Sequence, residues 1–292
     1  MTLSPRNTLS LSRADRQLAA VLRLCALLAV VVVLLILLFL FGESWPILSH
    51  VPVWRFLSDD SWHPGQALYD MSPMLTATVL SSAGALLLAV PLGIASALFS
   101  SYYASPGLAA VYRRLIELLA GIPSVVYGFW GLTTLAPLLG QWHPPGVSLL
   151  SATLVLALMV LPTVALTAEA ALLAVPQHYY RCAAALGLSR WSSLVGVVLP
   201  AARTGIIAGA LLAAARAIGE TMAVLMVAGN VVQMPHSLFD SVRTLTANIA
   251  LEMAYAMGDH RAALFVSGLA LMVLVLALVG LADAYKGQAA HD

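Results

Sequence analysis

The sequence predicts an all-α integral membrane protein, and three observations carry that prediction. Hydrophobic residues make up 61% of the 292 residues and charged residues only 9%, against roughly 25% charged in an ordinary soluble domain. The mean hydropathy is +0.93, which is more apolar surface than a soluble fold buries. Six apolar stretches can each cross a hydrocarbon core about 30 Å thick as a helix that rises about 1.5 Å per residue.

The six predicted spans alternate with loops of unequal length. The first span follows a tail of residues 1–20, and its apolar run is too long for a signal peptide, so we expect a retained anchor. The outer loops are residues 42–73 and 233–261, the second long enough for a short helix, and the tail is 283–292. The spans are residues 21–41, 74–100, 115–139, 149–168, 205–232 and 262–282, of which 74–282 form the core.

The basic residues predict the orientation, because cytoplasmic loops carry an excess of Lys and Arg. With the N-terminus inside, nine basic residues fall in inner segments and three in outer segments, so both termini are predicted to be cytoplasmic. The inner residues are Arg6, Arg13, Arg16, Arg113, Arg114, Arg181, Arg190, Arg203 and Lys286, and the outer ones are Arg55, Arg243 and Arg261.

The chain lacks the motifs of several functional classes. Its only lysine is Lys286, so it has no G-x-x-x-x-G-K-[ST] loop and cannot bind ATP through one. The net charge is +1, and no basic tract suggests nucleic acid as a partner. Cys25 and Cys182 lie far apart and the seven histidines show no ligand spacing, so neither a disulfide nor a metal site is expected.

The longest inner segment, residues 169–203, is predicted to form two short helices joined by a turn. The stretch "YYRCAAAL" is rich in good helix formers, and Pro176 suits the start of the first helix. Gly187 stands where a helix C-cap favours positive φ, Ser189 suits the next N-cap, and Pro200 is expected to end the second helix. The residues alone leave two interpretations open: a re-entrant connection without a partner, or a small helix that enters a groove of another protein.

The spacing in this segment resembles the loop E-A-A-x3-G-x9-I-x-L-P, by which permeases of ABC importers dock onto their ATPase subunit. The matching residues are Ala183, Gly187, Val197, Leu199 and Pro200. Two positions depart from the pattern, since Arg181 stands where the family has Glu and Cys182 stands where it has the first Ala. The resemblance implies an ATPase-coupling segment whose backbone shape is kept and whose usual acidic contact is missing.

Four further stretches extend the resemblance over most of residues 50–282. They are "AVPLGIASALF", "ELLAGIPSVVYGFWGL", "LLAVP" and "ARAIGETMAVLMVAGN", and they are similar to phosphate permeases of the PstC type. The resemblance implies the type I ABC importer permease fold (MetI-like) with six transmembrane helices. It also implies a transport subunit that is not itself an enzyme.

The resemblance further implies a set of partners in a bacterial inner membrane. A second, PstA-like permease would complete the phosphate pathway within the membrane lipid, and two PstB-like ATPase subunits would bind ATP and Mg²⁺ below it. A periplasmic or lipid-anchored PstS-like phosphate-binding protein would dock above, and no cofactor is expected on this chain.

One alternative is a permease for another oxyanion, molybdate or sulfate, against which "IPSVVYG" and "GETMAV" argue. A second is a stand-alone secondary transporter, which an inverted internal repeat would favour, and no such repeat is evident.

Two charged residues stand inside the fifth predicted span. Arg216 and Glu220 are four residues apart, so we expect them to share one helix face. A charge at the bilayer centre costs about 2.5–3.5 kcal/mol on insertion scales, and intramembrane charges are therefore candidates for function. One interpretation is an ion pair that locks helix packing. We favour the other, in which Arg216 faces an anion pathway, because a guanidinium matches phosphate oxygens, and Glu220 tunes the attraction.

Other residues are candidates for packing, hinging or weak contacts with substrate. Gly205, Gly209 and Ala213 form a small-x-x-x-small row that permits close helix approach. Three prolines are expected to kink the second, third and fourth spans, either as hinges or as static shape: Pro91, Pro123 and Pro162. The weaker pathway candidates are Ser124, Tyr127, Thr221 and Asn230.

Overall fold

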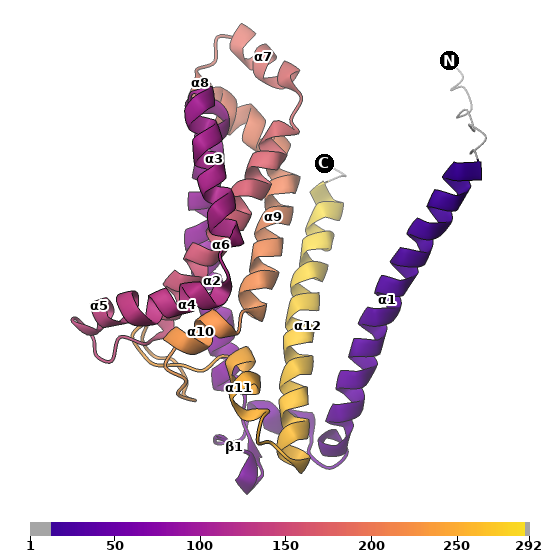
Figure 1. Cartoon of the computed structure of the whole chain (residues 1–292), viewed down its shortest axis with the longest axis vertical. Coiled ribbons are helices and arrows are strands. Elements are labelled where there is room, and N and C mark those ends of the chain that lie inside the picture. The colour runs from indigo at the N-terminus through magenta and orange to yellow at the C-terminus, as the bar shows by residue number, and fades with distance from the viewer. Residues whose placement is uncertain (1–12, 290–292) are drawn as a thin grey trace.

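Long helices dominate the computed structural model, which describes residues 13–289 (Figure 1). Among these residues, five helices are long and apolar enough to cross a membrane, or six if one sharply bent pair forms a single span. The long helices run along the long axis of the molecule, and the short helix Leu245–Glu252 and a small hairpin lie toward its lower end in Figure 1. The predicted all-α membrane fold is therefore confirmed.

The first span stands to one side of the other helices. Helix α1 (Arg13–Leu48) is longer than predicted, and its most apolar window is 0% buried within this chain. Its contacts are chiefly with α12 (Gly258–Ala289), where Phe39 and Phe265 meet edge to face at 5.7 Å. Since this surface is apolar, it suits lipid or the helices of another chain.

The centre of the fold is formed by three helices that pack through small residues. Helix α6 (Leu149–Leu173) lies between α2 (Ser72–Leu98) and α9 (Leu199–Gly219). A Cβ added at Gly205 would lie 2.6 Å from Ala171 Cβ, one at Gly209 would collide with Thr167, and Ala213 is fully buried. The row of small residues therefore packs closely against a neighbouring helix, as the sequence predicts.

The three prolines have different effects on their helices. Helices α2 and α6 continue through Pro91 and Pro162, so these two positions do not interrupt the spans. The third span does break at Pro123, because Ile122 takes an extended conformation (φ −67°, ψ 128°), as residues before proline tend to do. Helix α3 (Pro106–Gly121) and the segment Ser124–Gly140 meet at 91°, so the kink expected at Pro123 is present, as a sharp break within the predicted span 115–139.

That bent segment consists of α4 (Ser124–Trp130), a π-helical turn (Gly131–Leu135) and α5 (Ala136–Gly140). It runs across the direction of the long helices rather than along it (Figure 1). The third span thus differs in shape from the straight helices beside it.

The fifth span is displaced from its predicted limits at both ends. A continuous helix runs over Arg190–Gly219, formed by α8 (Arg190–Ser193), a π-helical turn (Leu194–Val198) and α9. Pro200 lies in the first turn of α9, where its missing N–H is tolerated, so it does not end the helix as expected. The helix stops at Gly219, and the predicted span 205–232 is therefore wrong in its second half.

The outer segments fold into a small structured layer around the lower ends of the helices. The first contains two 3-10 turns (Val53–Leu57 and Pro64–Gln66) and a hairpin of β1 (Trp62–His63) with β2 (Leu68–Tyr69). Arg55 donates two 2.9 Å hydrogen bonds to Asp59, and this pairing lowers the pKa of the Asp59 carboxyl. The second outer segment contains the expected short helix, α11 (Leu245–Glu252).

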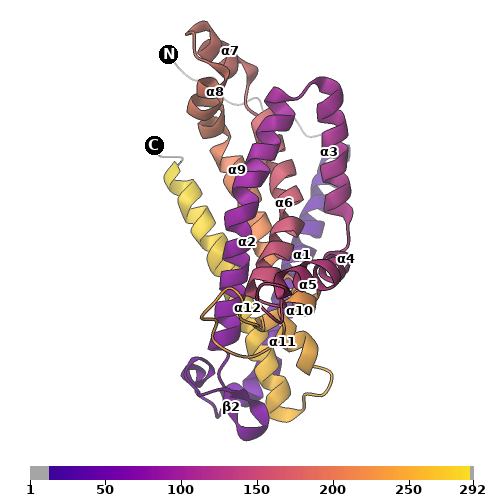
Figure 2. The ribbon, with the colours of Figure 1, turned by 90° about the vertical axis from the view of Figure 1, so that its left-hand side faces the viewer.

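The opposite end of the molecule carries α7 (Gln177–Ala185) and α8, and α7 lies beyond the ends of the long helices in both views (Figures 1 and 2). The first turn of α1 and the last turn of α12 lie toward this same end (Figure 1). The two ends of the described chain and the long inner segment therefore lie at the same end of the molecule, and the cytoplasmic placement of that end stays a prediction.

Accessibility of engineered cysteines tests this topology. In a background without Cys25 and Cys182, cysteines at Asp60 and Ser237 are expected to react with a membrane-impermeant thiol reagent added to intact cells, and one at Ser189 is not. All three sites are exposed in the chain, so folding does not hide them. The reverse labelling pattern would contradict the orientation.

Candidate functional site

The fifth span breaks at Glu220, and this break is the centre of the candidate site. Helix α9 ends at Gly219, and Glu220 adopts an extended conformation (φ −69°, ψ 130°). Helix α10 (Met222–Val227) begins two residues later, and Glu220 Oε1 accepts a 3.1 Å hydrogen bond from the backbone N–H of Ala223. The carboxylate therefore satisfies a free N–H at the start of α10, as capping side chains do.

Arg216 and Glu220 do not share a helix face, contrary to the sequence prediction. Arg216 lies in the last turn of α9, whereas Glu220 is already outside the helix. Among residues 15–280, whose side chains the structure describes, no ion pair or hydrogen bond joins Arg216 to another side chain, and the residue is exposed. A cation at a helix C-terminus is favourable because the free carbonyls carry partial negative charge, so each charge stands at the helix end that favours it.

A second contact holds the break from outside the span. Thr246 Oγ1, in the first turn of α11, donates a 2.8 Å hydrogen bond to the Glu220 carbonyl oxygen. Thr246 is 8% exposed, so this bond is largely shielded from water. The sequence analysis missed Thr246, because only the fold brings residues 26 positions apart together.

The broken third span lies directly against the broken fifth span. A Cβ added at Gly128 of α4 would lie 2.8 Å from Ala223 Cα of α10, so the two backbones approach closely. Tyr127 donates a 2.7 Å hydrogen bond to the Leu119 carbonyl across the 91° bend, and it is near enough to Arg216 for an electrostatic interaction. Tyr127 thus stabilises the bend between α3 and α4, close to Arg216.

The other polar candidates have different surroundings. Asn230 has φ +57°, and its Nδ2 donates to the Leu225 carbonyl at 2.8 Å, so it shapes the turn after α10. The Thr221 hydroxyl donates a hydrogen bond to the Gly219 carbonyl at 3.4 Å. Ser124 begins α4 and is half-buried. The structure therefore brings Arg216, Tyr127 and Glu220 into one region, whereas Asn230 stabilises the turn after α10.

The outer end holds a polar cluster that the sequence analysis did not single out. Glu252 is 7% exposed and accepts hydrogen bonds from Arg243 Nη1 (2.7 Å) and Trp62 Nε1 (2.9 Å), and it lies 2.8 Å from His260 Nε2. Arg243 Nε also donates to the Asn230 carbonyl at 3.0 Å. These residues border a cavity of about 560 Å³, and they tie α11 to α12 and to the first outer segment.

A buried carboxylate near the inner end was also missed. Glu169, 8% exposed on α6, accepts a 2.8 Å hydrogen bond from Ser100 Oγ and lies 3.9 Å from Arg113 Nε. The contacts connect α6 to the end of the second span and to α3. The sequence did offer one signal for this site, a single acidic residue at the end of an apolar stretch. Because an unpaired buried charge is costly, such a residue is expected to have a polar partner in the fold.

The inner segment largely matches its predicted local structure. Gly187 has φ +75°, as its C-cap position requires, and Ser189 Oγ accepts from Ser192 N as the predicted N-cap. Ala183 is the buried residue of α7 and is 3% exposed, whereas Cys182 is exposed. Leu199 and Pro200 begin α9, so the resembling loop spans α7, α8 and the start of the long helix.

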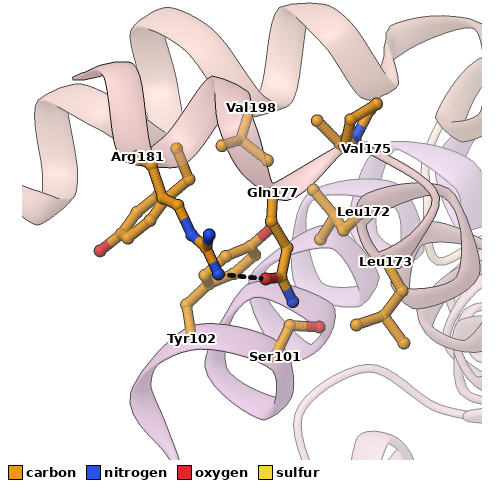
Figure 3. A pocket seen from close by; sticks show the side chains of 10 residues that line it. Ser101, Tyr102, Leu172, Leu173, Val175, Gln177, Arg181 and Val198 are labelled. Atoms are coloured by element: carbon orange, nitrogen blue, oxygen red, sulfur yellow. Dashed lines mark hydrogen bonds between the residues drawn. The ribbon is translucent and has the colours of Figure 1, made fainter. Parts of the chain in front are cut away.

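A cavity of about 250 Å³ lies between α7, the end of α6 and the end of the second span. The side chains of Arg181 and Gln177 converge at its edge above Tyr102 (Figure 3), and Arg181 Nη2 donates to Gln177 Oε1 at 3.1 Å. Arg181 remains exposed, so its charge is available at the surface of the segment.

No group of three or more metal-ligating side chains occurs in the described part of the chain. Cys25 and Cys182 are both free and exposed. The candidate site is a charged break at the end of a membrane-spanning helix.

The surroundings of the break define the class of protein. Gly219 is exposed beside Arg216 at the end of the helix Arg190–Gly219, which is long and apolar enough to span a membrane. Since a charge facing lipid is costly, this face must be covered by water or by another chain. A multi-pass membrane transport subunit has these properties.

Residues 89–286 match the family described as binding-protein-dependent transport system inner membrane component. The chain belongs to this family of ABC transporter permeases. It is 35% identical to the phosphate transport system permease protein PstC of Mesorhizobium japonicum, covering 90% of this chain and 87% of that protein. It is 37% identical to the probable ABC transporter permease protein YqgH of Bacillus subtilis, covering 84% and 82% respectively.

Solved structures with the same fold include other ABC transporters. A chain of a bacterial alginate ABC transporter, solved with an alginate-bound periplasmic protein, aligns over 90% of this chain and 93% of its own with a TM-score of 0.65 and 16% identity. A chain of the inward-facing MetNI methionine transporter covers 74% and 92% with a TM-score of 0.56 and 18% identity. These similarities confirm the predicted MetI-like permease fold.

Replacing Thr246 tests its hold on the break. Thr246→Val removes the donor to the Glu220 carbonyl, and an unsatisfied buried polar group costs about 1–3 kcal/mol, so we expect a lower unfolding temperature. Thr246→Ser keeps the hydroxyl and is expected to stay near the wild type. Thr133→Val is the matched control, because the Thr133 hydroxyl is exposed and bonds only its own helix. Equal unfolding temperatures for the Val and Ser variants would contradict the assignment.

Proposed function

We propose that this chain is a membrane-spanning permease subunit of an ATP-driven importer of inorganic phosphate. The observation that carries the proposal is Arg216, an exposed arginine without an ion-pair partner among the described residues, at the end of a span that breaks beside it. Sequence relatives named as phosphate permeases over most of the chain support phosphate as the substrate. The guanidinium fork suits phosphate oxygens.

The pathway lies between this chain and a second permease of the same fold. In this chain its wall is formed by the end of α9, the start of α10 and the nearby α4. Arg216 attracts the anion electrostatically, and Glu220, half-buried and bound to Ala223 N, keeps negative charge near enough to prevent tight binding. A passage requires binding that is favourable but weak enough for release.

Partner subunits supply the energy and most of the recognition. A P-loop ATPase dimer binds ATP and Mg²⁺ and docks on the segment around Ala183, Gly187 and Pro200, so that nucleotide-driven closure moves α7 and α8. A phosphate-binding protein docks at the outer end, where the hairpin and α11 lie. The protein sits in a bacterial inner membrane with both termini in the cytoplasm.

Phosphate uptake by Arg216 variants tests the proposal. Arg216→Gln is expected to reduce phosphate uptake strongly, and Arg216→Lys partly, because lysine keeps the charge without the fork. Uptake is measured in a strain that lacks its own phosphate importers and is normalised to the assembled complex. Arg114→Gln, an exposed arginine on α3 outside the site, serves as the control.

Normal phosphate uptake by assembled Arg216→Gln would contradict the pathway role. Uptake of molybdate or sulfate in place of phosphate by the wild-type complex would instead support the other-oxyanion alternative.

A further inference from the structure

The inner end of the molecule presents a segment whose charges are all positive. Between Glu169 and Glu220 the sequence contains no Asp or Glu. We define the coupling segment as residues 176–193, which comprise α7, the turn at Gly187 and α8. Its two arginines, Arg181 and Arg190, are both exposed, so this surface is cationic.

The coupling segment also exposes large apolar side chains. Leu186 is 81% exposed and Trp191 is 63% exposed, and Tyr179 is 45% exposed. Three large apolar side chains exposed in so short a segment favour an interaction site. A partner that covers it must combine an apolar cleft with groups that attract arginine.

The placement of the segment favours an aqueous partner over the lipid bilayer. The helix over Arg190–Gly219 has 30 residues and is therefore about 45 Å long, against a hydrocarbon core of about 30 Å. Helix α7 lies beyond the ends of the other long helices in both views (Figures 1 and 2). The coupling segment thus projects away from the membrane.

We propose that the ATPase subunit that pairs with this chain receives the coupling segment in an apolar cleft edged by carboxylates, with acidic side chains facing Arg181 and Arg190. The inference rests on the proposed function, which supplies an ATPase as the partner, and adds the sign of the charge on its docking surface. Leu186 and Trp191 fill the cleft. Arg181 Nη2 also donates a hydrogen bond to Gln177 Oε1 within α7.

Binding of the cognate ATPase to the permease pair, measured as a function of salt, tests the inference. The permease pair is embedded in nanodiscs of zwitterionic lipid, without phosphate or binding protein. Exposed charges across an interface act through association rate and salt dependence. The wild-type dissociation constant is therefore expected to rise with salt, and the double variant Arg181→Glu, Arg190→Glu is expected to raise it about tenfold at low salt.

Two further variants separate charge from folding. The neutral double variant Arg181→Gln, Arg190→Gln is expected to weaken binding less than the charge reversal does, which a folding defect would not produce. Arg114→Glu reverses an exposed arginine outside the segment and is expected to bind like the wild type. Assembly of the permease pair is checked for each variant before binding is measured.

Four results decide between the possibilities. Graded loss of affinity in neutral lipid supports the acidic cleft. An affinity that changes neither with salt nor with the charge reversal overturns it. An effect of the charge reversal that appears only in anionic lipid also overturns it, because the arginines would then bind lipid headgroups. Intact, salt-dependent binding in a complex that fails to import phosphate would overturn the proposed function and leave this inference standing.

Discussion

The architecture of the site depends on the hydrogen-bonded turn around Glu220. Its carboxylate accepts the N–H of Ala223, and its carbonyl accepts the hydroxyl of Thr246. Where a helix ends, some of its backbone N–H and C=O groups lose their hydrogen-bond partners. These two bonds satisfy such groups, as is required inside a membrane. Because α9 can end there, Arg216 comes to lie at a helix C-terminus and Glu220 at a helix N-terminus, and each charge is favoured by its own helix end.

The remaining fold brings a second broken span to the same place. The bend at Pro123 turns α4 across the other helices, and Gly128 lets α4 approach α10 closely. Straight helices packed through Gly205 and Gly209 hold these irregular parts in position. Irregular backbone at membrane depth is tolerated where it is buried in protein or lines an aqueous cavity, and an exposed arginine beside it requires the same surroundings.

The sequence predicted the class, the small-residue packing and the local structure of the inner segment, because these depend on composition and short-range spacing. Gly187 and Ser189 are examples, since cap positions are set by their own backbone. The shape of the broken spans was not predictable in this way. Pro91, Pro123 and Pro162 are the same residue in similar apolar contexts, yet only Pro123 breaks its helix. Thr246 contacts Glu220 only because of the tertiary fold. The four-residue spacing of Arg216 and Glu220 predicted that both lie on one helix, but the helix ends between them.

Charge-selective labelling at the break tests the central claim most directly. Gly219 is exposed, and a Cβ there would meet no atom within 4 Å, so Gly219→Cys places a thiol beside Arg216 without steric conflict. In the assembled, otherwise cysteine-free complex, the account predicts faster reaction with a small anionic thiol reagent than with a cationic reagent of equal size. It also predicts that Arg216→Gln removes this preference. A thiol that reacts with neither reagent, or a preference that survives without Arg216, would contradict an aqueous anion passage at this arginine.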